Sequence, residues 1–194
     1  MFPTLRQIER GLDGAARPVT ADADAAVMVC LREEDGEVQV LLVRRAVRAG
    51  DPWSGHVGLP GGRPSPADAD PLDTARRETI EEVGFDPLTA GRLLGALPVL
   101  HTRTLRIRVA AYVAHVPEVV EPVLSDELTS AWWTSLQRLR PDMVRVPELP
   151  DPVEALLDDG GVPEPHVVWG ITFRLLGLLR DAGGPAGVVE TPEP

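Results

Sequence analysis

A short acidic segment that begins after a pair of glycines and ends at another glycine constrains this chain most. Gly61-Gly62 is followed by the run Arg77-Glu78-Thr79-Ile80-Glu81-Glu82-Val83-Gly84-Phe85. On a helix, which turns about 100° per residue, glutamates at positions i, i+3 and i+4 fall within one arc of roughly 100°. Three carboxylates that close repel one another, but hard oxygen donors are the ligands that Mg²⁺ and Mn²⁺ prefer. The run therefore predicts a metal site on one helical face, made by Glu78, Glu81 and Glu82.

The residues around this run predict where the helix begins and ends. Asp70 can cap the N-terminus, Pro71 suits the first helical position, and Asp73 places negative charge near the positive end of the helix dipole. Gly84 can supply a left-handed C-terminal cap. The arc opposite the glutamates is mostly apolar and should pack on a sheet; it holds Leu72, Ala75, Thr79, Ile80 and Val83.

An ordinary solvated acidic face is the alternative, but it leaves the double glycine and the Arg-Glu pair unexplained. The segment is similar to the Nudix box, G-x5-E-x7-R-E-U-x-E-E-x-G-U, where U is a bulky apolar residue. Its second half matches at Arg77-Glu78, Glu81-Glu82, Gly84 and Phe85. Its first half departs, because 14 residues separate Gly62 from Arg77, one more than in the pattern, and none is a glutamate. Asp68 and Asp70 are acids available in its place.

The Nudix resemblance implies an α/β fold, an α/β/α sandwich with a mixed sheet. It also implies hydrolysis of a diphosphate with Mg²⁺ or Mn²⁺ held by the three glutamates. Such ions would neutralise phosphate oxygens and lower the pKa of the attacking water. We expect Arg77 to orient the glutamates by charge-assisted hydrogen bonds. The general base differs among Nudix members, and the candidates in this chain are Glu78, Glu82 and Glu127.

Composition agrees with such an enzyme. The chain has 194 residues and a net charge of −11, which disfavours nucleic-acid binding, although bound divalent cations can still attract a polyanionic substrate. The single cysteine, Cys30, excludes an intramolecular disulfide. We find no run long enough to span a membrane and no signal-peptide pattern, so a cytoplasmic protein without a membrane partner is expected. A homodimer is left open.

The pattern of apolar residues and turn signals predicts one domain over 1–182 and a disordered tail over 183–194. Helices are expected at 4–12 and 171–180 as well as at the glutamate run. Residues 141–165 are expected to be mostly irregular, apart from a helical turn at 153–157. Strands are expected at 25–32, 37–44, 57–59, 93–100, 105–116, 131–134 and 167–168.

Three further segments resemble the coenzyme A pyrophosphatase branch of Nudix proteins. That branch carries LLTxR(S/A) and then G-Q-x-x-F-P-G-G ahead of its box, and W-G-x-T before its last helix. The matching segments here are 41–46, 55–62 and 169–172, and the acidic stretch 66–70 resembles one in the same branch. Val43, His56 and Leu59 replace the threonine, glutamine and phenylalanine of the signature.

Several residues are candidates for contacts with the substrate. Arg45, Arg103 or Arg106 could hold a phosphate bidentately. Arg106 and Arg108 alternate with apolar residues, so a strand would place both on one face, where a solvent-facing role is the alternative. Trp53 could stack on an adenine. The remaining candidates beside the box are His56, Gly61 and Gly62.

Three hypotheses follow for the activity on a small nucleotide diphosphate. The first is hydrolysis of coenzyme A or a derivative. The second is the same reaction on ADP-ribose, NADH or nucleoside triphosphates. The third is a catalytically silent nucleotide sensor, and the presence of all three box glutamates counts against it.

Overall fold

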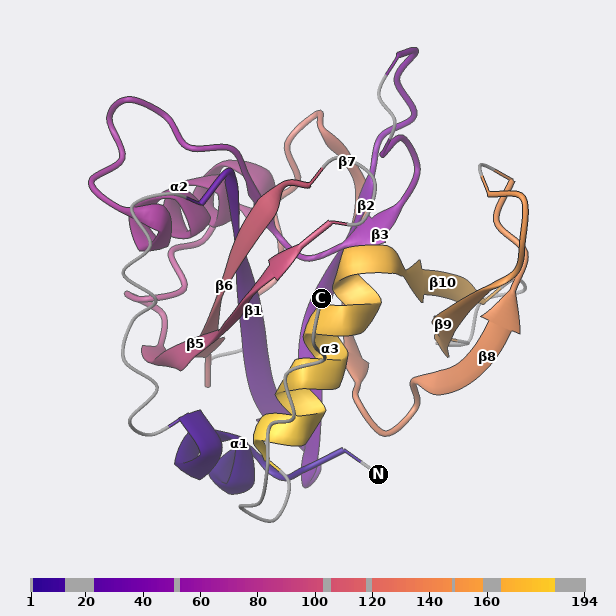
Figure 1. Cartoon of the computed structure of the whole chain (residues 1–194). Coiled ribbons are helices and arrows are strands. Elements are labelled where there is room, and N and C mark those ends of the chain that lie inside the picture. The colour runs from indigo at the N-terminus through magenta and orange to yellow at the C-terminus, as the bar shows by residue number, and fades with distance from the viewer. Residues whose placement is uncertain are drawn as a thin grey trace.

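The computed structural model describes residues 2–12, 23–50, 53–102, 106–117, 120–147, 149–158 and 165–183 (Figure 1). The helices are α1 (Leu5–Leu12), α2 (Pro71–Val83) and α3 (Gly170–Ala182). The strands are β1 (Ala25–Glu34), β2 (Glu37–Arg45), β3 (Val57–Gly58), β4 (Gly61–Gly62), β5 (Arg92–His101), β6 (Arg108–His115), β7 (Leu128–Ser135), β8 (Arg140–Val144), β9 (Val153–Asp158) and β10 (His166–Trp169).

A seven-stranded mixed sheet forms the centre of the molecule. Its main path runs β3-β2-β1-β6-β5, with β7 paired to β2 and β4 paired to β1. Only the pairing of β1 with β6 is parallel among the described strands. The last four residues of β1, 31–34, pair with β2, whereas Ala26 and Val27 near its start pair with Gly62 and Gly61. The segment from β3 to β4 thus passes from β2 to β1 and brings the double glycine into the sheet.

Helices cover both faces of this sheet, which confirms the expected α/β sandwich (Figure 1). On one face α1 and α3 pack over buried side chains that include Val29, Leu31 and Leu42. On the other face α2 packs over a second cluster that includes Met28 and Cys30. The alternation of neighbouring β1 residues between the two clusters follows from the two-residue period of a strand. Trp132 and Trp133 follow the same rule and contact opposite clusters.

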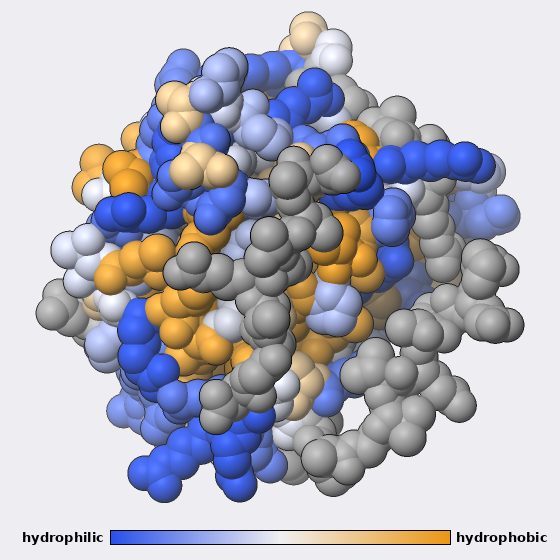
Figure 2. Space-filling model, turned by 60° about the vertical axis from the view of Figure 1, so that its left-hand side comes forward, coloured by the Kyte–Doolittle hydropathy of each residue, from blue (hydrophilic) through white to orange (hydrophobic). Residues whose placement is uncertain are grey.

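The edge strand β5 is less completely covered than the centre of the sheet. Its apolar residues Leu93, Leu94 and Leu100 are only half-buried. Figure 2 shows this side of the molecule, where hydrophobic side chains group in the middle and hydrophilic ones surround them.

A second, three-stranded antiparallel sheet in the order β10-β9-β8 corrects the expectation for residues 141–165. The prediction of a helical turn at 153–157 was wrong, because this segment is β9 and pairs with both neighbours. The proline and acidic residues of this segment argued against strands in the sequence. However, β8 is an exposed edge strand that contains Pro141, and edge strands tolerate proline. His166↔Asp158 pairing aligns β10 with β9, and β10 leads directly into α3.

Two smaller expectations also need correction. Arg106 does not share a strand face with Arg108, because β6 begins at Arg108 and Arg106 has a φ of 51°. Ile80, expected on the packed side of α2, is 41% exposed. The predicted tail, apart from its first residue, lies outside the described residues. That first residue, Gly183, is buried beside Pro3.

The predicted caps of α2 are confirmed. Asp70 accepts a hydrogen bond from the backbone N–H of Asp73, and Pro71 occupies the first turn. Gly84 has a φ of 79°, and its N–H donates to the carbonyl of Ile80. An added Cβ at Gly84 would lie 2.8 Å from the Cβ of Val123, so the loop that contains Val123 packs closely on this cap.

We therefore expect Gly84→Ala to cost more stability than left-handed backbone strain alone. The matched control is Gly36→Ala, because Gly36 has a φ of 78° and nothing within 4 Å of an added Cβ. Strain alone should lower the free energy of unfolding by about 1 kcal/mol at Gly36, and the clash with Val123 should bring the loss at Gly84 to about 2–3 kcal/mol. Urea unfolding of both variants measures the difference. Equal losses would show that the packing of the loop on α2 contributes nothing.

Candidate active site

Glu82 is a buried carboxylate at the centre of the site. The residue is 4% exposed, and its Oε2 accepts a hydrogen bond of 2.9 Å from the backbone N–H of Gly61. Burial raises the pKa of Glu82 to about 7; the Gly61 N–H opposes the shift, and the nearby Glu78 charge adds to it. Gly61 has a φ of 152°, and an added Cβ would lie 2.4 Å from the carbonyl oxygen of Ala26. Only glycine therefore brings this N–H to Glu82.

Glu78 lies against the second glycine. An ideal Cβ at Gly62 would lie 2.5 Å from the carboxyl carbon of Glu78, so this carboxylate occupies the space that a side chain at Gly62 would need. The pKa of Glu78 is raised, first by burial and then by the charges of Glu81 and Glu127, although Arg77 opposes the shift. The double glycine thus makes room for one glutamate and binds another.

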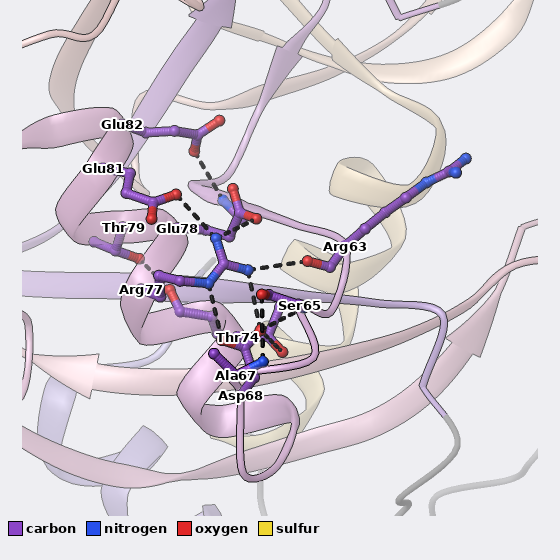
Figure 3. Close-up of polar contacts among 12 residues, drawn as sticks. Arg63, Ser65, Ala67, Asp68, Thr74, Arg77, Glu78, Thr79, Glu81 and Glu82 are labelled. Atoms are coloured by element: carbon purple, nitrogen blue, oxygen red, sulfur yellow. Dashed lines mark hydrogen bonds and ion pairs between the residues drawn. The ribbon is translucent and has the colours of Figure 1, made fainter.

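Arg77 connects the glutamates to the loop that precedes α2 (Figure 3). Its Nη1 lies 2.9 Å from Oε1 of Glu78 and 2.9 Å from Oε2 of Glu81. Its Nε and Nη2 donate to the two carboxylate oxygens of Asp68 at 2.9 and 3.0 Å, and Nη2 also donates to the carbonyl of Arg63. The arginine therefore holds two glutamates in place, while its expected catalytic role stays a prediction.

Asp68 stands where the first half of the box has its glutamate. Besides Arg77, its carboxylate accepts hydrogen bonds from the N–H of Ser65 at 2.8 Å and from the hydroxyl of Thr74 at 2.9 Å. These bonds, that from Arg77 foremost, hold the pKa of Asp68 well below its usual range. Five residues separate Gly62 from Asp68, which is the box spacing, so the extra residue falls between Asp68 and Arg77. Counting from Gly62 alone would have found this acid.

Arg45 and Glu127 border the buried carboxylates. Arg45 ends β2 with its Nη1 4.0 Å from Oε1 of Glu82. Glu127 is exposed, but its charge contributes to the raised pKa of both Glu78 and Glu82. Its loop is attached on two sides: the N–H of Ser125 donates to the carbonyl of Glu82, and the carbonyl of Glu127 accepts from Ala46.

Of the four remaining predicted substrate residues, the structure describes three. His56 packs edge-on against Trp169, with 4.9 Å between ring centroids, and its carbonyl accepts a hydrogen bond from the N–H of Arg45. Trp53 is 38% exposed in the loop between β2 and β3. Arg106 is exposed before β6, and Arg103 lies outside the described residues.

The residues present fit a hard divalent cation. The donors are all carboxylate oxygens, and the two most buried, on Glu78 and Glu82, keep a proton more readily than usual because burial penalises their charge. A bound cation would stabilise their ionised forms. Within the described part of the chain, no three His, Cys, Asp or Glu side chains are already gathered closely enough to hold an ion. In this conformation Glu81 is 59% exposed at its side chain and turned toward Arg77.

The fold and the site define a class of α/β proteins in which a carboxylate-bearing helix on one face of a mixed sheet lies beside a double glycine. The family model for the NUDIX domain matches residues 22–152, and the chain belongs to the Nudix family. A MutT/nudix family protein from Enterococcus faecalis has a similar fold, with a TM-score of 0.54 at 18% identity over 91% of this chain and 68% of that one.

Curated relatives match over shorter stretches. Nudix hydrolase 15, mitochondrial, of Arabidopsis thaliana is 36% identical over 104 residues, which are 50% of this chain and 36% of that protein. The human mitochondrial coenzyme A diphosphatase NUDT8 is 43% identical over 77 residues, 39% of this chain and 33% of that protein. The chain thus matches about a third of the length of each. In the described part of the chain, no helix is long and apolar enough to cross a membrane.

Asp68→Asn should loosen the glutamates by releasing Arg77. Removing one member of this largely buried pair should lower the free energy of unfolding by about 3 kcal/mol and weaken Mn²⁺ binding. Asp86→Asn is the matched control, because Asp86 binds Arg76 of α2 bidentately and has no glutamate contact among the described residues. Urea unfolding and calorimetric Mn²⁺ titration should show lost stability in both variants but weakened Mn²⁺ binding only in Asp68→Asn. Unchanged Mn²⁺ affinity in Asp68→Asn would contradict a positioning role for Asp68.

The raised pKa of Glu82 predicts how stability depends on pH without metal. Between pH 4.5 and 7 the folded protein holds a proton on Glu82 that the unfolded chain has released, so stability falls as pH rises through this range. Glu82→Gln removes this loss and should gain on the order of 3 kcal/mol relative to wild type between pH 5 and 8. Thermal unfolding in EDTA checks this, and the difference between the two curves cancels the contributions of the histidines. Parallel curves would show that Glu82 titrates normally.

Proposed function

We propose that this protein hydrolyses a diphosphate bond in a nucleoside diphosphate linked to a second group, with Mg²⁺ or Mn²⁺ as cofactor. The observation that carries the proposal is the buried carboxylate of Glu82 and the half-buried carboxylate of Glu78, both held at the double glycine. Membership of the Nudix family supports the reaction class. Coenzyme A or a derivative is the proposed substrate.

Different side chains of the site have different proposed roles in this reaction. Glu78, Glu81 and Glu82 would hold the cations, which when bound shield the phosphates and activate water. Water oxygen attacks one phosphorus, the bridging P–O bond breaks, and a carboxylate accepts the proton. Glu82, whose pKa burial raises in the metal-free protein, is the first candidate for that transfer; Glu78 and Glu127 remain the other candidates. Arg77 keeps Glu78 and Glu81 in position.

Substrate contacts are proposed around this centre. Arg45, 4.0 Å from Glu82, can pair with a phosphate once cations neutralise the glutamates. Gly61 and Gly62 are proposed to contact the substrate through their backbone, and Trp53 offers a partly exposed ring for stacking. The remaining candidates are His56, Arg103 and Arg106.

The coenzyme A assignment is supported by the segments 41–46, 55–62 and 169–172 and by the name of the human relative. ADP-ribose, NADH or nucleoside triphosphates are the alternative, because the departures at Val43, His56 and Leu59 fall on the coenzyme A signature itself. A silent sensor is the weakest candidate, since the box glutamates are retained. A cytoplasmic location, a homodimer and the lack of nucleic-acid and membrane partners stay predictions.

Glu82→Gln should abolish hydrolysis in Mg²⁺ while the protein stays folded. A loss of at least about a thousandfold in kcat is expected if Glu82 both holds cation and accepts the proton. Glu81→Gln should also lower kcat. Glu154→Gln, an exposed glutamate of β9, is the control and should keep full activity. Steady-state turnover with and without EDTA checks all three variants, and wild-type turnover in excess EDTA would refute the metal-dependent mechanism.

The substrate is best identified by a screen of the wild-type protein. Coenzyme A, ADP-ribose, NADH, diadenosine polyphosphates and nucleoside triphosphates should each be incubated with Mg²⁺ and the products weighed by mass spectrometry. Hydrolysis of coenzyme A to two phosphate-bearing products at the highest kcat/KM is the expected result. Product masses from H₂¹⁸O also identify the phosphorus that is attacked.

A further inference from the structure

Two loops continue side by side beyond the paired ends of β2 and β7. The pairing of these strands closes with Arg45 opposite Leu128, after a shift in register. Beyond it, the N–H of Ala46 still donates a hydrogen bond of 2.8 Å to the carbonyl of Glu127. The ends of a strand pair open more readily than its centre, because they have fewer packed neighbours. Glu127, a candidate base of the proposed reaction, therefore lies where the sheet needs further support.

Arg48 supplies a contact past this last backbone hydrogen bond. Its Nη2 donates a hydrogen bond of 3.0 Å to the carbonyl oxygen of Asp126 and lies 3.3 Å from Oδ2 of the same residue. One guanidinium thus binds both the main chain and the side chain of the residue directly before Glu127. A bond to the main chain also restrains the next residue, because consecutive residues share a planar peptide.

The backbone of Arg48 is itself held by Ser54. The Ser54 Oγ accepts a hydrogen bond of 2.6 Å from the N–H of Arg48, and it donates to the carbonyl of Arg48 at 3.2 Å. The main chain of Arg48 is therefore fixed on both sides of its side chain. Less conformational entropy is lost when a side chain on a fixed backbone forms an ion pair than when both partners are mobile.

The loop of Glu127 is also attached to α2, where the N–H of Ser125 donates to the carbonyl of Glu82. Glu127 is exposed, and its negative charge is close enough to contribute to the raised pKa of both Glu78 and Glu82. When ionised, the three carboxylates repel one another, and the exposed one is the freest to move away. The contact of Arg48 with the neighbouring residue opposes that movement from the side of β2.

We propose that Arg48 is a positioning residue for Glu127, which it holds near the glutamates of α2 through its contact with Asp126. The inference rests on the proposed hydrolase function and adds to it a residue that acts without touching cation or substrate. It also gives Glu127 a part in the transition state. A displaced carboxylate slows the chemical step but leaves substrate binding intact, so the effect should fall on kcat.

Kinetics of variants of the ion pair test this proposal. Arg48→Met should lower kcat about 3- to 10-fold with KM unchanged, because one partly exposed ion pair and one hydrogen bond to a carbonyl are lost. Asp126→Asn should lower kcat in the same direction, and the double variant should be no worse than Arg48→Met, since both changes break one contact. Arg48→Lys keeps the charge and should recover part of kcat. A higher KM in Arg48→Met with no effect of Asp126→Asn would show that Arg48 binds substrate and would overturn the proposal.

A second double variant tests whether Arg48 acts through Glu127. Glu127→Gln should lower kcat more than Arg48→Met does, and adding Arg48→Met to Glu127→Gln should cause no further loss. A further loss as large as that in wild type would contradict the proposal, and so would full activity of Glu127→Gln. Both of these results leave hydrolysis by wild type, and with it the proposed function, intact.

Arg92→Met is the matched control. Arg92 is exposed and forms an ion pair of 2.8 Å with Glu9, far away along the chain. It lies opposite His115 at the end of β6, whereas the double glycine pairs with the start of β1, the parallel neighbour of β6. This variant removes a surface cation and an ion pair as Arg48→Met does, but it should change neither kcat nor KM.

Hydrogen–deuterium exchange separates this contact from the reaction. Without metal or substrate, Arg48→Met should speed the exchange of the amides of Ala46 and Ser125, which hold the two loops, and Arg92→Met should not. Mass spectrometry of peptides that cover 44–49 and 123–128 measures this. Faster exchange supports the contact even if no substrate is hydrolysed, and unchanged exchange in both peptides would refute it, whatever the outcome of the kinetics. Thermal unfolding of each variant confirms that it is folded.

Discussion

The hydrogen bond from Gly61 to Glu82 is the constraint on which the site depends. It attaches α2 to β4, which pairs with β1. It also holds the carboxylate of Glu82 where burial raises its pKa to about 7. The bond needs a residue without a side chain, because the carbonyl of Ala26 leaves no space for a Cβ. The same glycine also pairs with Val27 of β1, so this contact belongs both to the sheet and to the site.

The adjacent arginines of α2, Arg76 and Arg77, have different roles. Arg76 turns toward Asp86 and attaches the helix to the turn that follows it. Arg77 turns the other way, to Asp68 and two glutamates, and spreads positive charge over carboxylates that would otherwise repel. A helix of 13 residues can therefore be anchored at one side and keep a concentrated negative charge at the other.

The sequence predicted α2 and its caps well because their causes are local. Asp70, Pro71 and Gly84 act within one turn of the helix, and periodicity identified most of its packed face. Residues 141–165 were misjudged because β8 and β9 are stabilised by pairing with each other and with β10, which no local preference of a proline-rich segment reveals. The glutamates could be named from their spacing, whereas the role of Asp68 required either a count from Gly62 or the fold of the loop. Arg44 stands at the unspecified position of the segment 41–46, so the motif predicted nothing about it.

The second sheet changes what β2 can do. β10 places His166 against Arg44 and Trp169 against His56. The end of β2, a strand whose sequence predicts a buried core position, therefore also has polar neighbours. Arg45 then lies 4.0 Å from the buried Glu82 on one side of β2, and Arg44 lines a cavity together with Trp169 on the other. A box of the same design could accept many diphosphates, so discrimination must come from residues outside it. The adjacent arginines at the end of β2 lie on two different sides of the sheet, because Arg45 approaches Glu82 while Arg44 contacts His166 of β10.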